Sequence, residues 1–411
     1  MDPFNRLPAE LIQEIISQSA DFIGTEGLLL VSPRVHAVFH AQPRWILLDL
    51  MASNSITQIP TVHKLCRNIA LIRHPLIHCL SLEDYQNTCE TTPTLPEHMN
   101  TAELLQILHI AAHIQRLTCI CLSTMHQNLI SAIQNQPEDL FSGPLPAQRA
   151  SEPFCWIEQY RVSWALWHLQ HCSDLQTTAK HRWNWPAESL RELDPYLVWN
   201  AIDPTLAEQI WTVSAVLADL GLHPSYQTPD LHSLNLYGAL TWLPNELLNK
   251  HNQEPPLPTW HYPDETPLPF FDSLQLSPAN THPYTRYWSP PPVPNYTLAN
   301  SYWGRTPRRC DRRSSGAMMF KAYGSRMSRH SPPNYGMWEM RLYRRLGATI
   351  WDPRRLHLVG LFDCNARARM RRPDRWIIEG LSEGHVQPRS HAKEIQARWL
   401  ALVGKRLVLE P

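Results

Sequence analysis

A dense run of prolines between residues 252 and 294 limits what this chain can fold into more than any other feature. It carries 12 of the 37 prolines in the sequence. Proline fixes a backbone dihedral angle and lacks an N–H donor, so this run can form neither a regular helix nor a central β-strand. Aromatic residues are interleaved with the prolines, whereas solvated linkers are poor in aromatics. Residues 251–300 are therefore either a linker or, as the aromatics favour, an extended strap along a domain.

Upstream of this proline-rich run, apolar residues recur at the three- and four-residue spacing of amphipathic helices. The segments that show this spacing are 61–78, 101–117 with a continuation from Leu122 to Ile133, 156–171 and 203–220. The polar stretch 81–100 contains two prolines and is predicted to be a loop. No repeat of 20–50 residues is present, so a solenoid or propeller is not supported. The pattern predicts a mainly α protein with an irregular helical domain at residues 51–250.

The first fifty residues contain a short amphipathic helix. Pro8 suits a first helical turn because its missing N–H would be unpaired there, and Glu10 favours the same turn through the helix dipole. The next apolar residues form one stripe at helical spacing: Leu11, Ile12, Ile15 and Ile16. A helix this short is marginal alone, so its stripe must dock on something. A helical hairpin of this size has too small a core to cover the whole stripe, which makes a partner surface plausible.

These residues carry a family resemblance. The pattern Leu7-Pro8-x-Glu10-Leu11, the paired isoleucines, Leu29-x-Val31-Ser32-Pro33, Phe39 and Trp45 resembles the F-box over about residues 4–50. It is similar to the F-box that opens many uncharacterised fungal proteins of this length. Three later segments resemble the same fungal group: Tyr160–Gln170, Trp183–Pro186 and Gly347–Leu356.

The resemblance implies a three-helix module that binds the Skp adaptor of a cullin–RING ubiquitin ligase. By resemblance, the adaptor contact falls to Leu7, Pro8, Leu11, Ile15, Val31 and Val35. The chain would then be a non-catalytic substrate receptor for an unknown target protein, with the F-box at residues 1–50. The alternative is an ordinary amphipathic helix packed in a core, because short motifs also match by chance.

Charge is distributed unevenly along a chain whose formal net charge is zero. Residues 301–376 carry 18 Lys and Arg, 17 of them Arg, against five Asp and Glu, while residues 1–300 carry 14 basic against 28 acidic residues. Because arginine pairs bidentately with carboxylates, we expect the Arg-rich part, 301–411, to pack on the helical domain.

The arginines also allow a different function. Two clusters, at 305–313 and 367–375, could bind an acidic or phosphorylated partner. The candidate residues are Arg308, Arg309, Arg312, Arg313, Arg371 and Arg372. With neighbouring aromatics available for stacking, the alternative function is a nucleic-acid- or chromatin-associated protein.

No pattern of catalysis or metal binding emerges. The histidine groups (His109 with His113, His168 with His171 and Cys172, His74 with His78 and Cys79) lack H-E-x-x-H or a second pair of zinc ligands. No glycine-rich phosphate loop occurs. We therefore predict a non-catalytic protein with no metal and no cofactor. A further alternative is an enzyme whose site is assembled from dispersed Cys and His residues, which would require a concave pocket with perturbed groups.

The cysteines and the apolar runs bear on the compartment. Nine scattered cysteines, without C-x-x-C, favour a reducing compartment, the cytoplasm and/or the nucleus. The first residues lack the basic and apolar regions of a secretory signal, and no run of eighteen apolar residues exists, so we expect no membrane partner.

Overall fold

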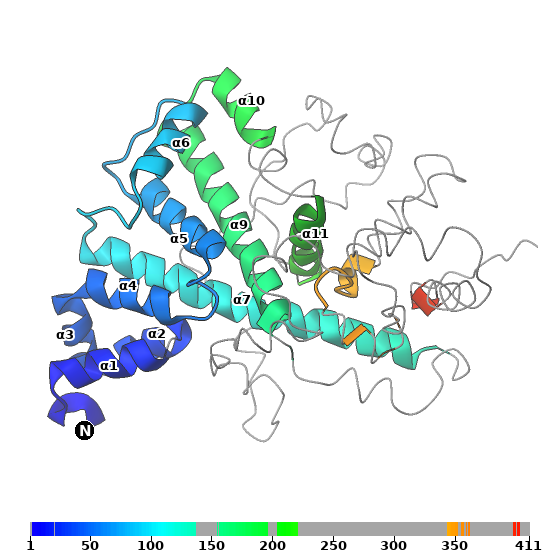
Figure 1. Ribbon diagram of the computed structural model, residues 1–411, viewed down its shortest axis with the longest axis horizontal. Helices are drawn as coiled ribbons and strands as arrows, with labels where there is room; N and C mark the ends of the chain where they lie inside the picture. Colours follow the sequence, from blue (N-terminus) through cyan, green and yellow to red (C-terminus); the bar gives the residue numbers. More distant parts are fainter. Residues whose placement is uncertain are drawn as a thin grey trace, which may run out of the picture.

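The computed structural model describes residues 2–19, 21–136, 154, 156–195, 204–220, 343–351, 355–356, 359, 361, 398–399 and 401–402. Across these residues the chain is helical and contains no β-strand, which confirms the mainly α prediction (Figure 1). The proline-rich run at 252–294 and the arginine clusters at 305–313 and 367–375 lie outside the described residues.

The first 53 residues form a group of helices that we call the head. It consists of the 3₁₀ turn η1 (Pro3–Arg6), α1 (Ala9–Ser19), α2 (Phe22–Val31), α3 (Pro33–Ala41) and α4 (Pro43–Ser53). The head thus has four α-helices, where the F-box resemblance implies three. The boundaries follow from the sequence: Asp21 accepts hydrogen bonds from the first N–H groups of α2, Ser32 caps α3, and Pro43 opens α4.

The remaining helices form the body. They are α5 (Pro60–Arg73), α6 (Leu82–Thr91), α7 (Thr101–Gln134), α9 (Trp156–His181), α10 (Ala187–Pro195) and α11 (Pro204–Asp219). α7 starts with a reciprocal capping box between Asn100 and Glu103 and continues unbroken through both of its predicted parts. α9 crosses it and packs on α5, α7 and α11 (Figure 1).

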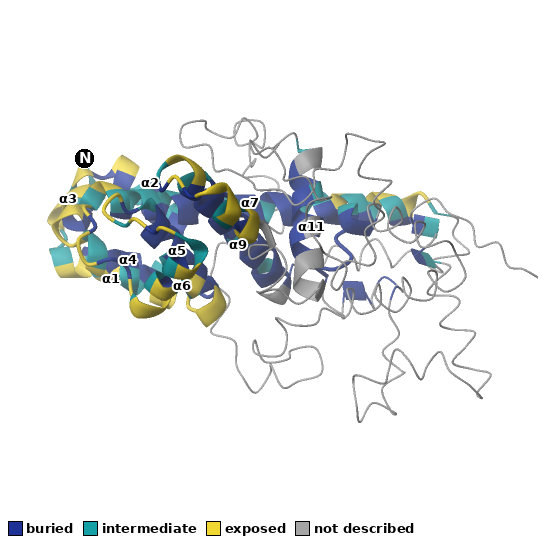
Figure 2. Cartoon of the chain, turned by 90° about the horizontal axis from the view of Figure 1, so that it is seen from above, coloured by how far each residue is buried: buried dark blue, intermediate teal, exposed yellow. Residues whose placement is uncertain are grey.

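The apolar character of α7 reflects its central position. By length and composition it is the one helix in the described part of the chain that could cross a membrane. However, 67% of its most apolar window is buried inside the protein, as in a core helix, so it is weak evidence for a membrane span. Figure 2 shows α7 buried along much of its length between the other helices.

Residues 81–100 correct one prediction, because this stretch contains α6 and is not wholly a loop. The Ser81 hydroxyl accepts a hydrogen bond from the Asp84 N–H, and acidic residues occupy the first turn, where the helix dipole favours them. α6 is short, and its two buried residues, Tyr85 and Cys89, are too few to produce a periodic apolar pattern. The prolines that suggested a loop lie beyond its end.

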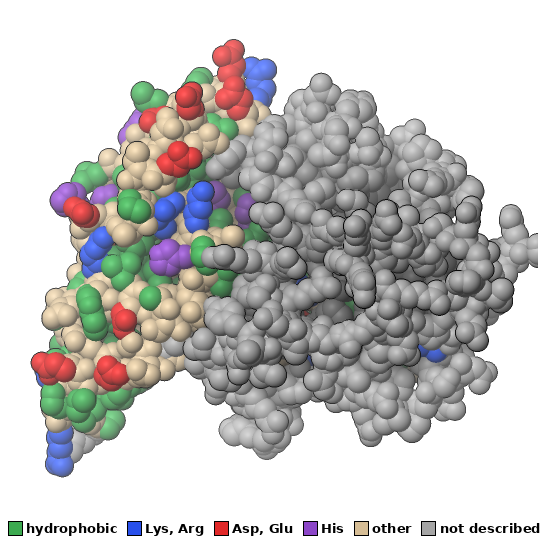
Figure 3. Space-filling model, in the orientation of Figure 1, with side chains coloured by type: hydrophobic (Ala, Val, Ile, Leu, Met, Phe, Trp, Pro, Cys, Tyr) green, Lys and Arg blue, Asp and Glu red, His purple; other side chains and the backbone are tan. Residues whose placement is uncertain are grey.

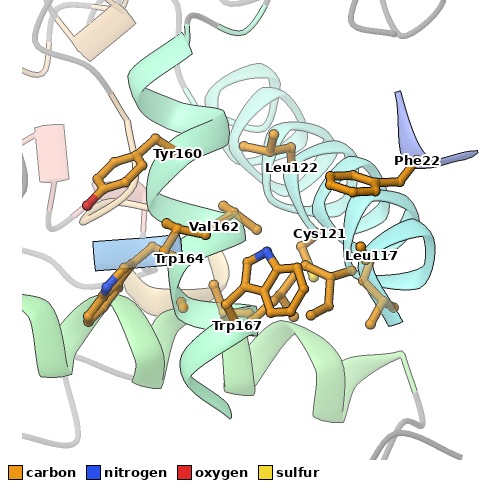
Figure 4. Close-up of a cluster of buried hydrophobic side chains, with 14 of the residues drawn as sticks. Phe22, Leu117, Cys121, Leu122, Tyr160, Val162, Trp164 and Trp167 are labelled. Carbon is orange, nitrogen blue, oxygen red and sulfur yellow. The ribbon is translucent and has the colours of Figure 1, made fainter. Parts of the chain in front are cut away.

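Two hydrophobic clusters hold the helices together. The main cluster joins the inner faces of the head to α7, α9 and α11. Its centre contains the aromatics of α9, as their spacing predicted: Tyr160, Trp164 and Trp167 are at most 7% exposed (Figure 4). A second cluster lies between the end of α5, α6, the end of α9 and α10.

The described part of the C-terminal region belongs to the main cluster. Ile350 and Trp351 are fully buried, and their backbone carbonyls accept hydrogen bonds from Arg161 of α9 at 2.7 and 2.9 Å. Arg355 pairs with Glu158 at 2.8 and 3.0 Å. One arginine of the Arg-rich part therefore meets a carboxylate from the acidic part of the chain.

Candidate docking surface

The large hydrophobic side chains left exposed in the described residues fall into two groups. Five of the seven belong to the head and two to the segment between α5 and α6. The head residues are Leu11 and Ile15 of α1, Leu30 and Val31 of α2, and Trp45 of α4. Because water is an unfavourable environment for these side chains, each group needs an explanation.

α1 carries two apolar stripes that face in different directions. Ile12 and Ile16 are 0% exposed and enter the main cluster, whereas Leu11 and Ile15 are 51% and 39% exposed. Each pair is spaced by four residues, so each runs along one face of the helix. The four residues that the sequence presents as one stripe therefore divide into a core-facing half and a solvent-facing half.

The end of α2 presents the next two apolar residues. Leu29 is buried, but Leu30 and Val31 are 78% and 73% exposed. α3 begins only one residue after α2 ends, with Ser32 between them. The Ser32 hydroxyl donates to Asp2 at 2.7 Å, and this bond lowers the pKa of the Asp2 carboxyl. This hydrogen bond holds Asp2 beside the junction between α2 and α3.

Hydrogen bonds join α2 to α7 on the side of α2 that carries Glu26. They hold α2 in place, and with it the exposed residues at its C-terminal end. Burial raises the pKa of the Glu26 carboxyl, but hydrogen bonds from His109, at 2.6 Å, and from Arg116 outweigh burial, so the pKa is lowered overall. The charged carboxylate thus stays paired beneath the helix. The backbone N–H of Phe22 adds a bond to Gln115 of α7 at 3.1 Å.

Trp45 lies in the first turn of α4 and is 52% exposed. Its neighbour Arg44 donates to the backbone carbonyl of Leu95 at 2.6 Å and to that of Pro96. α4 also packs along α1, and Gln42 accepts a hydrogen bond from Gln13 of α1 at 3.2 Å. The exposed residues of α1 and α4 therefore lie on helices that contact each other.

The six residues assigned to an adaptor contact by resemblance do not all reach the surface. Pro8, Leu11, Ile15 and Val31 are exposed, and Leu7 is partly buried against the main cluster. Val35 is 0% exposed and packs in the core, so its assignment to an exposed contact needs correction. Its position one turn into α3 directs its side chain inward, and a helical pattern alone does not reveal which side of a helix faces the core.

Leu30 and Trp45 belong to the exposed group but were not among those six residues. The available signal for Leu30 was its place two residues before Ser32-Pro33, where a helix is expected to end. Acidic side chains adjoin the apolar ones: Glu10 and Glu14 of α1 are exposed. Figure 3 shows hydrophobic and acidic side chains together on the visible face of the head. Such a surface can bind another polypeptide through burial of apolar area.

Several histidines of the candidate metal-binding groups contact other side chains. His109 contacts Glu26, His171 shares a 2.7 Å hydrogen bond with Tyr85, and His74 lies 3.3 Å from Glu103. Burial lowers the pKa of His113 to about 3, so this side chain is neutral at neutral pH. Within the described ranges, no group of three or more His, Cys, Asp or Glu side chains is placed to hold a metal ion.

No protein-family model, no curated protein and no solved structure matches this chain.

Proposed function

We propose that this chain is an F-box substrate receptor that links the Skp adaptor of a cullin–RING ubiquitin ligase to a target protein. The observation that carries the proposal is the division of α1 into a buried stripe, Ile12 with Ile16, and an exposed stripe, Leu11 with Ile15. In this proposal the inner stripe holds the head together and the outer one binds the adaptor. The F-box pattern of residues 4–50 supplies the identity of the partner.

The energetics favour a partner over free exposure. Full burial of a leucine or isoleucine contributes about 1.5–3 kcal/mol, and Leu11 is already about half buried. Covering the exposed parts of Leu11 and Ile15 would then contribute roughly 1–3 kcal/mol together. Leu30, Val31 and Trp45 add further exposed apolar area on α2 and α4, and both of these helices contact α1. Exposed apolar groups of this kind mark interaction sites in other proteins.

The receptor itself would perform no chemistry. Its role would be to hold the target close to the conjugating enzyme, so that a reaction between two separate proteins proceeds within one complex. The body would then carry the surface that recognises the target.

The test is co-purification of the full chain with the Skp adaptor. Leu11→Asp combined with Ile15→Asp should weaken binding by roughly 100-fold or more, because two carboxylates would have to be buried in an apolar contact. Both side chains are exposed in the free chain, so folding should be retained, as circular dichroism would show. Leu76→Asp with Leu80→Asp, at exposed leucines outside the head, is the matched control. Adaptor binding by the head variant equal to that of this control would refute the proposal.

A further inference from the structure

The second group of exposed apolar side chains lies at the far end of the body. We call this region the tip and define it as residues 74–81 together with α6 and α10. Leu76 and Leu80 are 77% and 70% exposed, while Cys79 between them is fully buried and Ile77 packs against the second hydrophobic cluster. α6 and α10 contact each other beside this segment (Figure 1).

The segment that bears the two leucines is held rigidly. The indole N–H groups of Trp183 and Trp185 donate to the carbonyls of Ile77 and Cys79 at 2.9 and 2.6 Å. At its end, the N–H of Leu80 donates to an Asp84 carboxylate oxygen at 2.8 Å. Trp183 and Trp185 stack on each other with ring centroids 5.7 Å apart. Because the backbone is fixed in advance, a partner that covers Leu76 and Leu80 loses little conformational entropy in ordering it.

The helices beside the two leucines carry an excess of negative charge. Among the described side chains of α6 and α10, the exposed acidic residues are Glu83, Glu90, Glu188 and Glu192. Against these four carboxylates stand two exposed cations, Arg191 of α10 and Lys180 in the last turn of α9, so negative charge remains in excess. Figure 3 shows this concentration of acidic side chains at the upper end of the described surface, over α6 and α10. Glu83 is three residues from Leu80, and Glu188 follows three residues after Trp185, whose ring reaches Cys79.

We propose that the tip binds a basic polypeptide segment whose apolar side chains cover Leu76 and Leu80 while its Lys or Arg residues meet the carboxylates of α6 and α10. The sign of the charge selects this occupant. Nucleic acid and anionic membranes would be repelled by the same carboxylates. A neutral apolar partner would leave them without a counter-charge. The proposal that the tip binds a basic segment does not depend on the proposed function. Only the idea that this segment belongs to the target of a ubiquitin ligase rests on the proposed function.

The experiment measures binding of labelled peptides to the full chain by fluorescence polarisation. The probe is a short peptide with two leucines among lysines and serines. Two control peptides replace its lysines by glutamates or its leucines by serines. The first variant is Leu76→Ser with Leu80→Ser, and the second is Glu83→Gln with Glu188→Gln. We expect each variant to weaken binding of the basic probe roughly tenfold or more, and salt to weaken binding by the wild type.

Several results would overturn the inference. If the wild type and both tip variants bind the basic probe with equal affinity, the tip is not the binding site. If the glutamate peptide binds as tightly as the basic probe, the site does not select positive charge. If a peptide of this chain's own residues 305–313 binds the tip more tightly than the foreign probe, an intramolecular contact replaces a partner. Leu11→Asp with Ile15→Asp should leave probe binding unchanged. Because adaptor binding is scored separately, failure at the tip and failure at the head are distinguishable.

Discussion

The buried ion pair between Glu158 of α9 and Arg355 of the C-terminal region allows a stringent test of how the two parts of the chain are joined. The guanidinium donates two hydrogen bonds to the carboxylate, at 2.8 and 3.0 Å, and the two side chains are only 4% and 1% exposed. The guanidinium also lies 5.3 Å from the ring centroids of both Phe154 and Trp351. The proposed perturbation is Glu158→Gln, which preserves the shape of the side chain and removes its charge.

The magnitude follows from the burial of Arg355. An exposed ion pair contributes at most about 1 kcal/mol because water and salt screen it. Removing one partner of a buried pair leaves the other charge uncompensated and costs about 3–5 kcal/mol. A cation over a desolvated aromatic ring gains up to about 2 kcal/mol. The rings of Phe154 and Trp351 supply this in both the wild type and the variant, so it does not change the difference in stability between them. We therefore expect Glu158→Gln to lower the free energy of unfolding by about 3–5 kcal/mol.

The assay is urea unfolding of the full chain followed by tryptophan fluorescence, to which Trp351 contributes from within the affected cluster. Glu10→Gln, at an exposed carboxylate, is the control and should change stability by less than about 0.5 kcal/mol. Glu158→Gln combined with Arg355→Met should recover part of the loss, because it removes the buried positive charge as well. If Glu158→Gln alone destabilises no more than the control, the pair does not join the two parts in the way we infer.

Two further predictions concern acid and backbone geometry. Burial lowers the pKa of both His113 and His171 to about 3, against 6.5 for free histidine, so only the unfolded chain takes up these protons between those values. Stability should fall as the pH drops from about 6.5 towards 3, by up to ~1.4 kcal/mol per pH unit for each histidine; an unfolding midpoint insensitive to pH there would contradict this. Gly347 has a φ of 68°, and a Cβ there would lie 2.9 Å from both Met125 and Trp351. Gly347→Ala should therefore lower the melting temperature, at a cost of roughly 1–3 kcal/mol, whereas an unchanged melt would show that this turn adapts.

Much of the fold could be predicted from the sequence, because a long helix that packs in a core shows apolar residues at helical spacing whichever helices it packs against. α5, α7, α9 and α11 all coincide with segments where that spacing was found. Apolar periodicity does not reveal α6, because this helix buries only Tyr85 and Cys89. It is stabilised by the Ser81 cap and by contacts with other helices. A short polar helix of this kind is stable only when it packs on other parts of the chain, and the local sequence does not show which parts these are.

The candidate surface was predictable only in part, for a related reason. Sequence identified Leu11, Ile12, Ile15 and Ile16 as apolar, but exposure depends on which side of α1 meets α3 and α4. Val35 illustrates the error in one direction, since it is apolar and buried, and Leu30 in the other, since it is apolar and exposed. The tip was missed because Leu76 continued the helical spacing of 61–78, although α5 ends at Arg73, and because Leu80 lies outside every periodic segment. Trp183 and Trp185, about 100 residues later, place them at the surface.

The two exposed groups are supported by different cores, and this separation gives the experiments their power. The inner faces of the head pack in the main cluster with α7, whereas Ile77 and Cys79 of the tip pack in the second cluster with α6 and α10. Substitutions at distant sites that share no packing partners have additive effects. A head variant should therefore leave the tip intact, and a tip variant should leave the head intact. Each can control for the other because loss of binding at only one surface cannot be explained by unfolding of the whole chain.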